Sequence, residues 1–107
     1  MEDNKLAISE EEIKEKLQVF PGWRLEGNKI VKEFKLNSFI AVLNLINSLA
    51  PFFEKNDHHP DMHISYKNIT FELTRYDIGG RVTQNDFIAA REIEDKFIEL
   101  SKQKENK

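Results

Sequence analysis

The chain has 107 residues, 39% of them hydrophobic and 33% charged, and its 16 basic and 19 acidic side chains give a net charge of −3. This length predicts a single domain, residues 1–107, whose small core would gain from burial against a second copy, and the acidic balance argues against direct binding to nucleic acid or to an anionic membrane. The absence of cysteine excludes disulfides, thiolate metal ligands and cysteine nucleophiles.

The first predicted element is a helix that begins after Ser9. Ser9 and Glu12 have the spacing of a capping box, and Pro21-Gly22 ends the helix. The segment before it is polar and acidic, unlike a signal peptide. No stretch of the sequence reaches the roughly 20 apolar residues of a membrane span. We therefore expect a cytoplasmic protein.

The middle of the sequence predicts a hairpin followed by a long helix. Strands over Trp23–Glu26 and Lys29–Leu36 are joined by a two-residue turn, Gly27-Asn28. Asn37-Ser38 then caps a run with apolar residues at helical spacing over about four turns. Pro51 lies late in this run and predicts either a kink or a helix end with a short restart.

The last part of the sequence predicts a second hairpin and a third helix. Met62–Tyr66 pairs with Ile69–Arg75 across a two-residue turn, Lys67-Asn68, which gathers the apolar side chains on one face. Thr83 caps the third helix, with Asp86 at its third position. The order helix, hairpin, helix, hairpin, helix predicts an α+β fold, in which a four-stranded antiparallel sheet carries three helices packed on one face.

Between the long helix and the second hairpin lies the stretch E-K-N-D-H-H-P, residues 54–60, with His58 and His59 side by side. It fits a surface turn, because Asp and Pro are turn residues. It also fits a metal site in which Asp61 and His63 join the two histidines, although neighbours in extended chain point to opposite faces. Its third interpretation is acid–base chemistry, since an imidazole can donate or accept a proton near neutral pH. Spacing alone leaves these alternatives open.

Further motifs surround this stretch in a fixed order. Tyr66 follows Pro60 by six residues, L-T-R-Y-D-I-G-G and V-T-Q-N-D-F come after it, and F-P-G-W and E-G-N-K-I precede it. From about Ser9 to about Leu100, the chain resembles the pterin-4a-carbinolamine dehydratase family. The resemblance implies dehydration of 4a-hydroxytetrahydropterin to quinonoid dihydropterin, which recycles the tetrahydropterin cofactor of aromatic amino-acid hydroxylases. It implies no metal and no cofactor for the reaction itself.

The resemblance also implies a set of site residues. His58 and His59 are the implied catalytic pair, with His58 as the acid. Many family members have a histidine at the position of Tyr76, and Arg81 is an extra residue after Gly80. The residues implied to bind the substrate or support its pocket are Glu54, Pro60, Tyr66, Arg75, Tyr76, Asp77, Asp86 and Trp23.

Four of these residues also have a structural interpretation. Tyr66 beside a turn suits structural support, and Glu54 suits a solvated helix end. Trp23 on an apolar face suits the core, and Asp86 suits a capping box. The family forms dimers and tetramers, so the resemblance implies a homodimer or homotetramer. It also leaves an alternative function, a non-catalytic pterin-binding or protein-interaction module, because mammalian members serve as dimerisation cofactors of a homeodomain transcription factor.

Overall fold

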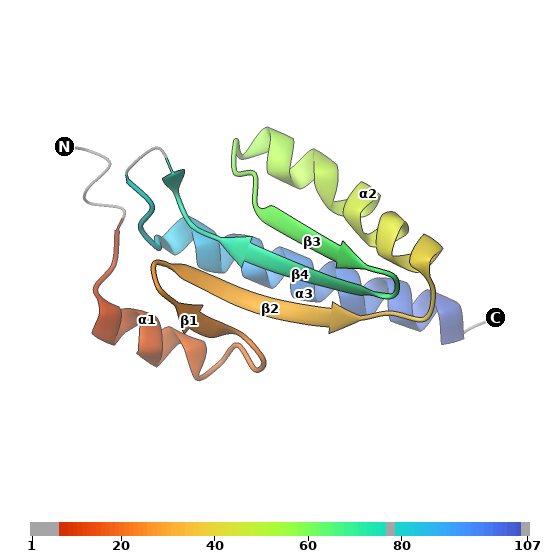
Figure 1. Cartoon of the computed structure of the whole chain (residues 1–107), viewed down its shortest axis with the longest axis horizontal. Helices are drawn as coiled ribbons and strands as arrows, with labels where there is room; N and C mark the ends of the chain where they lie inside the picture. The colour runs from red at the N-terminus through yellow and green to blue at the C-terminus, as the bar shows by residue number, and fades with distance from the viewer. Residues whose placement is uncertain (1–6, 77–78, 106–107) are drawn as a thin grey trace.

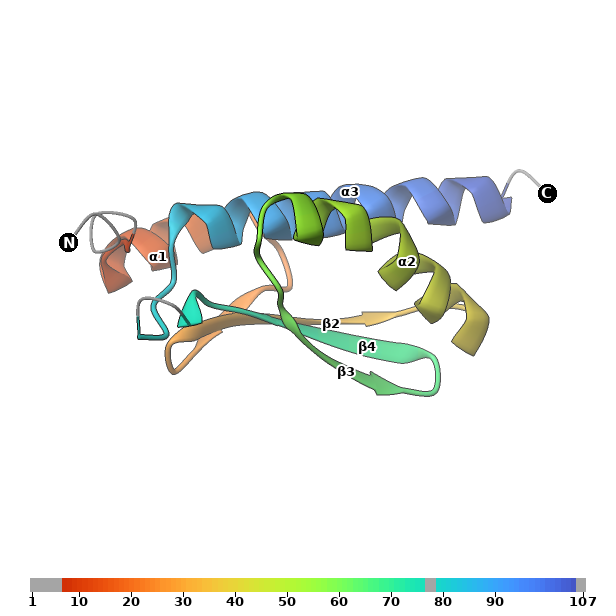
Figure 2. The ribbon, with the colours of Figure 1, turned by 90° about the horizontal axis from the view of Figure 1, so that it is seen from above.

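Three helices and four strands build the protein, as seen in a computed structural model that describes residues 7–76 and 79–105. The strands form one antiparallel sheet in the order β1-β2-β4-β3, and the three helices lie on one side of it (Figure 1, Figure 2). The predicted α+β class, with three helices and a four-stranded antiparallel sheet, is confirmed. In chain order the elements are α1 (Glu10–Leu17), β1 (Arg24–Glu26), β2 (Lys29–Lys35), α2 (Phe39–Lys55), β3 (Asp61–Ser65), β4 (Asn68–Leu73) and α3 (Gln84–Glu105).

The helices begin where the sequence places their caps. The Ser9 hydroxyl accepts a hydrogen bond from the Glu12 N–H at the start of α1, and Ser38 does the same for Ala41 at the start of α2. α2 continues through Pro51 to Lys55, so the predicted helix end at this proline is wrong. Pro51 lies in the last two turns of α2, and its missing N–H removes one backbone hydrogen bond, the one to the Asn47 carbonyl. None of the helices within the described residues is both long and apolar enough to cross a membrane.

The two hairpins differ in how well their turns were predicted. The first pairs as predicted across Gly27-Asn28. In the second, Ser65 pairs with Asn68, so the turn is Tyr66-Lys67 and the predicted turn at Lys67-Asn68 is wrong. Tyr66 has a φ of 58°, the left-handed value that tight hairpin turns need at their first central residue. This register differs from the predicted one by two residues, and side chains therefore keep their predicted faces because strands alternate with period two.

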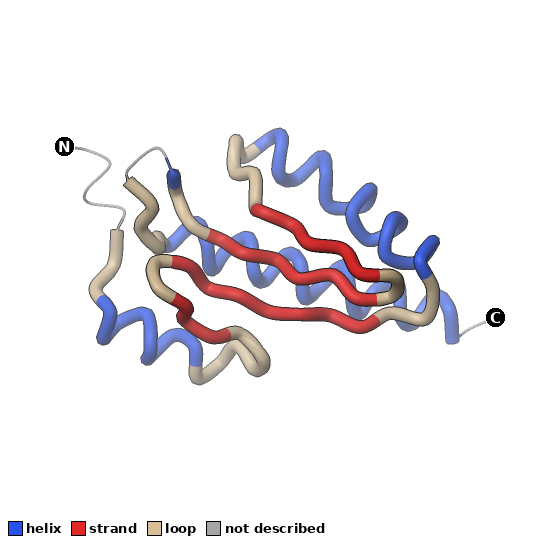
Figure 3. The backbone as a smooth tube through the Cα atoms, in the orientation of Figure 1, coloured by secondary structure: helices blue, strands red, loops and turns tan. Residues whose placement is uncertain are grey.

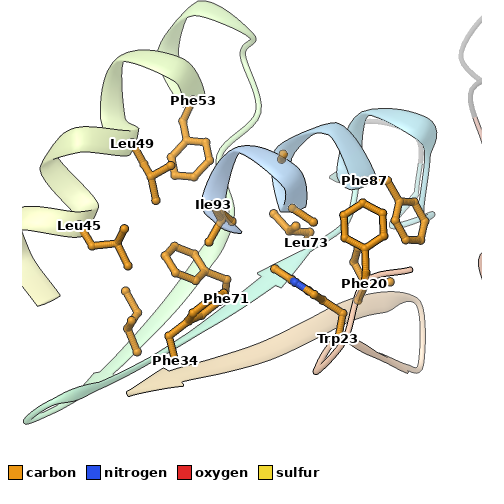
Figure 4. Close-up of a cluster of buried hydrophobic side chains, with 14 of the residues drawn as sticks. Phe20, Trp23, Phe34, Leu45, Leu49, Phe53, Phe71, Leu73, Phe87 and Ile93 are labelled. Atoms are coloured by element: carbon orange, nitrogen blue, oxygen red, sulfur yellow. The ribbon is translucent and has the colours of Figure 1, made fainter. Parts of the chain in front are cut away.

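The core lies between the sheet and the helices (Figure 4). From β4, Ile69, Phe71 and Leu73 face it and are fully buried. β3 is the edge strand of the sheet beside α2 (Figure 3). Its residues on the same face, Met62 and Ile64, are 38% and 43% exposed. The helices therefore cover the centre of the sheet well and leave this edge partly open.

Candidate active site

His58 follows directly from the way in which α2 ends. The His58 N–H donates to the Phe53 carbonyl at 3.0 Å, and the Asp57 N–H donates to the Glu54 carbonyl at 3.2 Å. These two bonds form a Schellman motif, which turns the chain off the helix axis. Asp57 has a φ of 49°, where such motifs usually have glycine. The motif carries His58 back toward the helix layer before Pro60 leads into β3.

The His58 side chain is buried against Asp86, in the first turn of α3. Its Nε2 lies 2.6 Å from Oδ1 of Asp86, and the two side chains are 5% and 0% exposed. The other oxygen of Asp86, Oδ2, accepts the Thr83 N–H at 2.7 Å and the Thr83 hydroxyl at 3.2 Å. One carboxylate therefore caps α3, as the spacing of Thr83 and Asp86 predicts, and holds His58. A buried imidazole with a carboxylate partner can exchange a proton in a fixed position.

His59 faces the solvent beside the end of α2. Its Nε2 lies 2.9 Å from Oε2 of Glu54, its Nδ1 lies 3.8 Å from Oδ1 of Asp57, and its side chain is 56% exposed. The adjacent histidines thus have different partners, one on α3 and one on α2. Within residues 7–76 and 79–105, no group of three or more His, Cys, Asp or Glu side chains is arranged to hold a metal ion.

A second polar cluster lies on the face of the sheet away from the helices. The Tyr76 hydroxyl donates to Oδ2 of Asp61. The Lys29 Nζ lies 2.9 Å from Oε1 of Glu72 and 3.7 Å from Oδ2 of Asp61, and Oε2 of Glu72 lies 3.2 Å from Nε2 of His63. The hydrogen bond to Glu72, followed by one to Tyr76, raises the pKa of Lys29 above its ordinary value of 10.5. Asp61 is the first residue after the His58-His59-Pro60 segment, and it therefore connects Tyr76 to that segment.

Two of the residues implied to bind substrate lie elsewhere in the fold. Trp23 is in the core (Figure 4), where it is 5% exposed. Its Nε1 donates to Oε2 of Glu94 at 2.9 Å. Glu94 is eight residues, about 12 Å, farther along α3 than Asp86. Tyr66 lies in the hairpin turn at the far end of β3, about 17 Å of strand from the histidines. The structure brings neither aromatic ring to His58.

The loop after β4 holds the other implied residues. Arg75 pairs through its backbone with Arg81, which donates to and accepts from it. Asp77 lies outside the described residues. Two cavities, of about 400 and 240 Å³, occur near the start of α2 and near the start of α1. Neither is lined by a histidine.

Sequence reasoning missed part of this arrangement. Thr83 was assigned only a capping role, although it also orients the partner of His58. Lys29 and Glu72 were assigned no role in a site, although their ion pair connects Asp61 to His63. The only available signal was the alternation of the strands, which placed Glu72 on the polar face without naming its partners.

The comparisons with known proteins agree with one another. The family model described as "Pterin 4 alpha carbinolamine dehydratase" matches residues 6–96. A candidate pterin-4-alpha-carbinolamine dehydratase of a Picosynechococcus species is 42% identical over 80 residues, which cover 75% of this chain and 86% of that protein. One from Streptomyces avermitilis is 35% identical over 88 residues, covering 82% and 87%.

A solved structure is also similar to this chain. The crystal structure of a transcriptional coactivator/pterin dehydratase from Brucella melitensis has a TM-score of 0.79 and 27% sequence identity to this chain. The likeness covers 84% of this chain and 97% of the Brucella protein. His58, His59 and Asp86 all lie within the residues that the family model matches.

Proposed function

Because the chain belongs to the pterin 4 alpha carbinolamine dehydratase family, we propose that it dehydrates 4a-hydroxytetrahydropterin to quinonoid dihydropterin. The product would then be available for reduction back to the tetrahydropterin cofactor of aromatic amino-acid hydroxylases. The observation that carries this proposal is the buried contact between His58 and Asp86, with His59 beside it. This arrangement suits proton transfer at a fixed point, which the reaction requires. A cytoplasmic location remains a prediction.

The reaction removes one molecule of water and transfers no other group. The bond between C4a and its hydroxyl oxygen breaks, and the hydroxyl leaves as water after taking a proton from an acid. The N5–H bond gives its electron pair to a new C4a=N5 double bond while a base takes the proton. One proton is supplied and one is removed, so two histidines can complete the cycle without a redox or metal cofactor.

The geometry favours separate tasks for the two histidines. His58 is buried beside a carboxylate that balances the charge of a protonated ring. We therefore assign His58 the role of the acid that protonates the departing hydroxyl. His59 is exposed and lies close to Glu54 and Asp57. We assign His59 the role of the base that removes the proton from N5 of the substrate. Tyr76, held by Asp61, is proposed to contact the substrate in place of the histidine that many family members have there.

Two exposed features support assembly into a homodimer or homotetramer. β3 is an edge strand whose Met62 and Ile64 are only partly covered, and unpaired edges readily pair with another chain. α2 carries no charged residue from Phe39 to Phe53, although several positions in it are exposed. In a chain with 33% charged residues, an uncharged exposed helix face is typical of an interface.

The activity can be tested by following the decay of the 4a-carbinolamine generated by an aromatic amino-acid hydroxylase. We expect the protein to accelerate the decay, and His58→Ala and His59→Ala each to lower kcat by roughly a hundredfold or more. Circular dichroism serves as the control that each variant is folded. Decay at the spontaneous rate with the natural protein, or undiminished acceleration by both variants, contradicts the proposal.

The alternative is a non-catalytic pterin-binding or interaction module. It is favoured by one observation, the coactivator named with the dehydratase in the Brucella structure. Isothermal titration with a dihydropterin, run beside the decay assay, separates the two functions. Pterin binding that leaves the spontaneous rate unchanged would support the alternative.

A further inference from the structure

We propose that Thr83 and Asp86 fix His58 in the tautomer that carries its hydrogen on Nε2, which leaves Nδ1 as the nitrogen that exchanges protons with a substrate. The tautomer follows from the packing of three buried side chains. Its catalytic consequence rests on the proposed dehydratase function. In this scheme Asp86 and Thr83 are positioning residues, because they act through His58.

Thr83 determines how the Asp86 carboxylate is used. A backbone N–H can only donate, and the Thr83 N–H lies 2.7 Å from Oδ2 of Asp86. The Thr83 hydroxyl reaches the same oxygen at 3.2 Å. Oδ2 is thereby engaged by two donors from one residue, and Oδ1 is directed at His58. A carboxylate that accepts on both oxygens requires a donor from the imidazole.

The contact between Asp86 and His58 has the length and burial of a strong hydrogen bond. Nε2 and Oδ1 are 2.6 Å apart, within the short range that is typical of bonds to an ionised group. Neither side chain can exchange this partner for water, since they are 5% and 0% exposed. Turning the ring over would place a carbon against Oδ1 and leave a buried carboxylate oxygen without its donor, which is unfavourable. The Nε2–H is therefore committed to Asp86.

The other ring nitrogen remains open. Nδ1 of His58 makes no hydrogen bond within the described residues. Among the buried side-chain nitrogen and oxygen atoms of these residues, only Asn68 Oδ1 lacks a hydrogen-bond partner. Nδ1 is therefore not sealed in the interior but reaches the surface of the molecule. When Nδ1 binds a proton, the ring becomes a cation beside the Asp86 carboxylate. When Nδ1 gives that proton to the leaving hydroxyl, the ring returns to the neutral Nε2–H form.

Nitrogen-15 NMR of the ring nitrogens reads the tautomer directly and needs no substrate. In the natural protein at a pH where His58 is neutral, we expect Nε2 to carry the hydrogen, with a far-downfield proton signal that exchanges slowly. Asp86→Ala should abolish this signal, because the acceptor is gone. A neutral His58 with its hydrogen on Nδ1, or a slowly exchanging Nε2–H signal that survives in Asp86→Ala, overturns the inference.

A matched pair of variants can distinguish the positioning role of Thr83 from a general effect of losing a helix cap. Thr83→Ala and Ser38→Ala each remove the hydroxyl of the residue that precedes a helix. We expect Thr83→Ala to speed the exchange of the His58 Nε2–H and to lower kcat roughly fivefold with little change in KM, the loss of about one hydrogen bond. Thr83→Ser should restore both, and Ser38→Ala should change neither. Equal effects of the two alanine variants overturn the positioning role of Thr83.

The outcomes for the tautomer and for the proposed function are distinguishable. If the natural protein shows the protected Nε2–H but does not accelerate carbinolamine decay, the dehydratase function fails and the tautomer stands. If the natural protein accelerates the decay while His58 carries its hydrogen on Nδ1, the function stands and the inference fails.

Discussion

Asp57 holds a backbone conformation that most residues avoid. Its φ of 49° closes the Schellman motif that turns the chain toward His58, and for a residue with a Cβ this region costs roughly 1 kcal/mol or more. Among the residues that the structure describes, its carboxylate has one ionic contact, a 3.8 Å approach to Nδ1 of the exposed His59. The motif therefore depends on the backbone of Asp57 much more than on its carboxylate.

Replacing Asp57 with glycine is expected to stabilise the protein. Relief of the left-handed strain should exceed the extra freedom of glycine in the unfolded chain and raise the free energy of unfolding by about 0.5 kcal/mol. Urea denaturation followed by circular dichroism measures the change. Asn56→Gly is the control, because Asn56 has a φ of −95° and its side chain donates to the Phe52 carbonyl. A gain in Asn56→Gly, or a loss in Asp57→Gly, contradicts this account.

Lys29 is a residue whose positive charge is stabilised by its neighbours. Hydrogen bonds to Glu72 and then to Tyr76 raise its pKa above 10.5. A raised pKa in the folded state means that the stabilising contribution is fully present below pH 10.5 and is lost as the pH rises above it.

We therefore expect Lys29→Met to be less stable than the natural protein by a constant amount between pH 7 and about pH 10. The difference in stability should shrink at higher pH. There Lys29 is already neutral in the unfolded natural protein while it is still charged in the folded one, so folding must take up a proton. Chemical denaturation across this pH range gives both curves. A difference between the two proteins that grows as the pH rises is the contrary result.

At the scale of single elements, α2 shows how tertiary packing overrides a local signal. Proline inside a helix removes a backbone hydrogen bond and disfavours the preceding turn. α2 nevertheless continues through Pro51, because Leu49 and Phe53 on either side of it are buried in the core. The apolar face that the sequence predicts for this helix is thus strong enough to carry the chain past the proline.

Pro51→Ala should consequently stabilise α2. Residue 51 is exposed, so no core contact is lost, and its new N–H can donate to the Asn47 carbonyl. We expect the free energy of unfolding to rise by about 1 kcal/mol, less than the full penalty of a central proline because residue 51 is near the helix end. Thermal and urea denaturation measure this free energy of unfolding. Ala50→Gly, at the neighbouring exposed position, is the control and should lower it. Destabilisation by Pro51→Ala would mean that the proline is built into the packing of α2.

At the scale of the whole molecule, the side of the sheet near β3 is incompletely covered. Met62 and Ile64 point to the helix side and remain 38% and 43% exposed, whereas their partners on β4 are fully buried. A second copy that covers these side chains would complete the core at this edge.

We expect the natural protein to assemble into a dimer or tetramer and Ile64→Glu to shift it toward the monomer. Size-exclusion chromatography with light scattering gives the molar mass. Ser65→Glu is the matched control, since it adds the same charge to an exposed neighbour on the other face of β3. Assembly that persists in Ile64→Glu, or is lost equally in Ser65→Glu, removes Ile64 from the interface.

The sequence alone determined the elements, their caps and the faces of the strands, because these depend on periodicity and on spacings of a few residues. It could not fix the second hairpin turn, since a shift of two residues leaves every side chain on the same face. Nor could it show that Asp86 meets His58 across 28 residues of chain, or that Lys29 joins Glu72 across 43. Those contacts arise when α3 packs beside α2 and when β2 pairs with β4, and only the tertiary structure decides them.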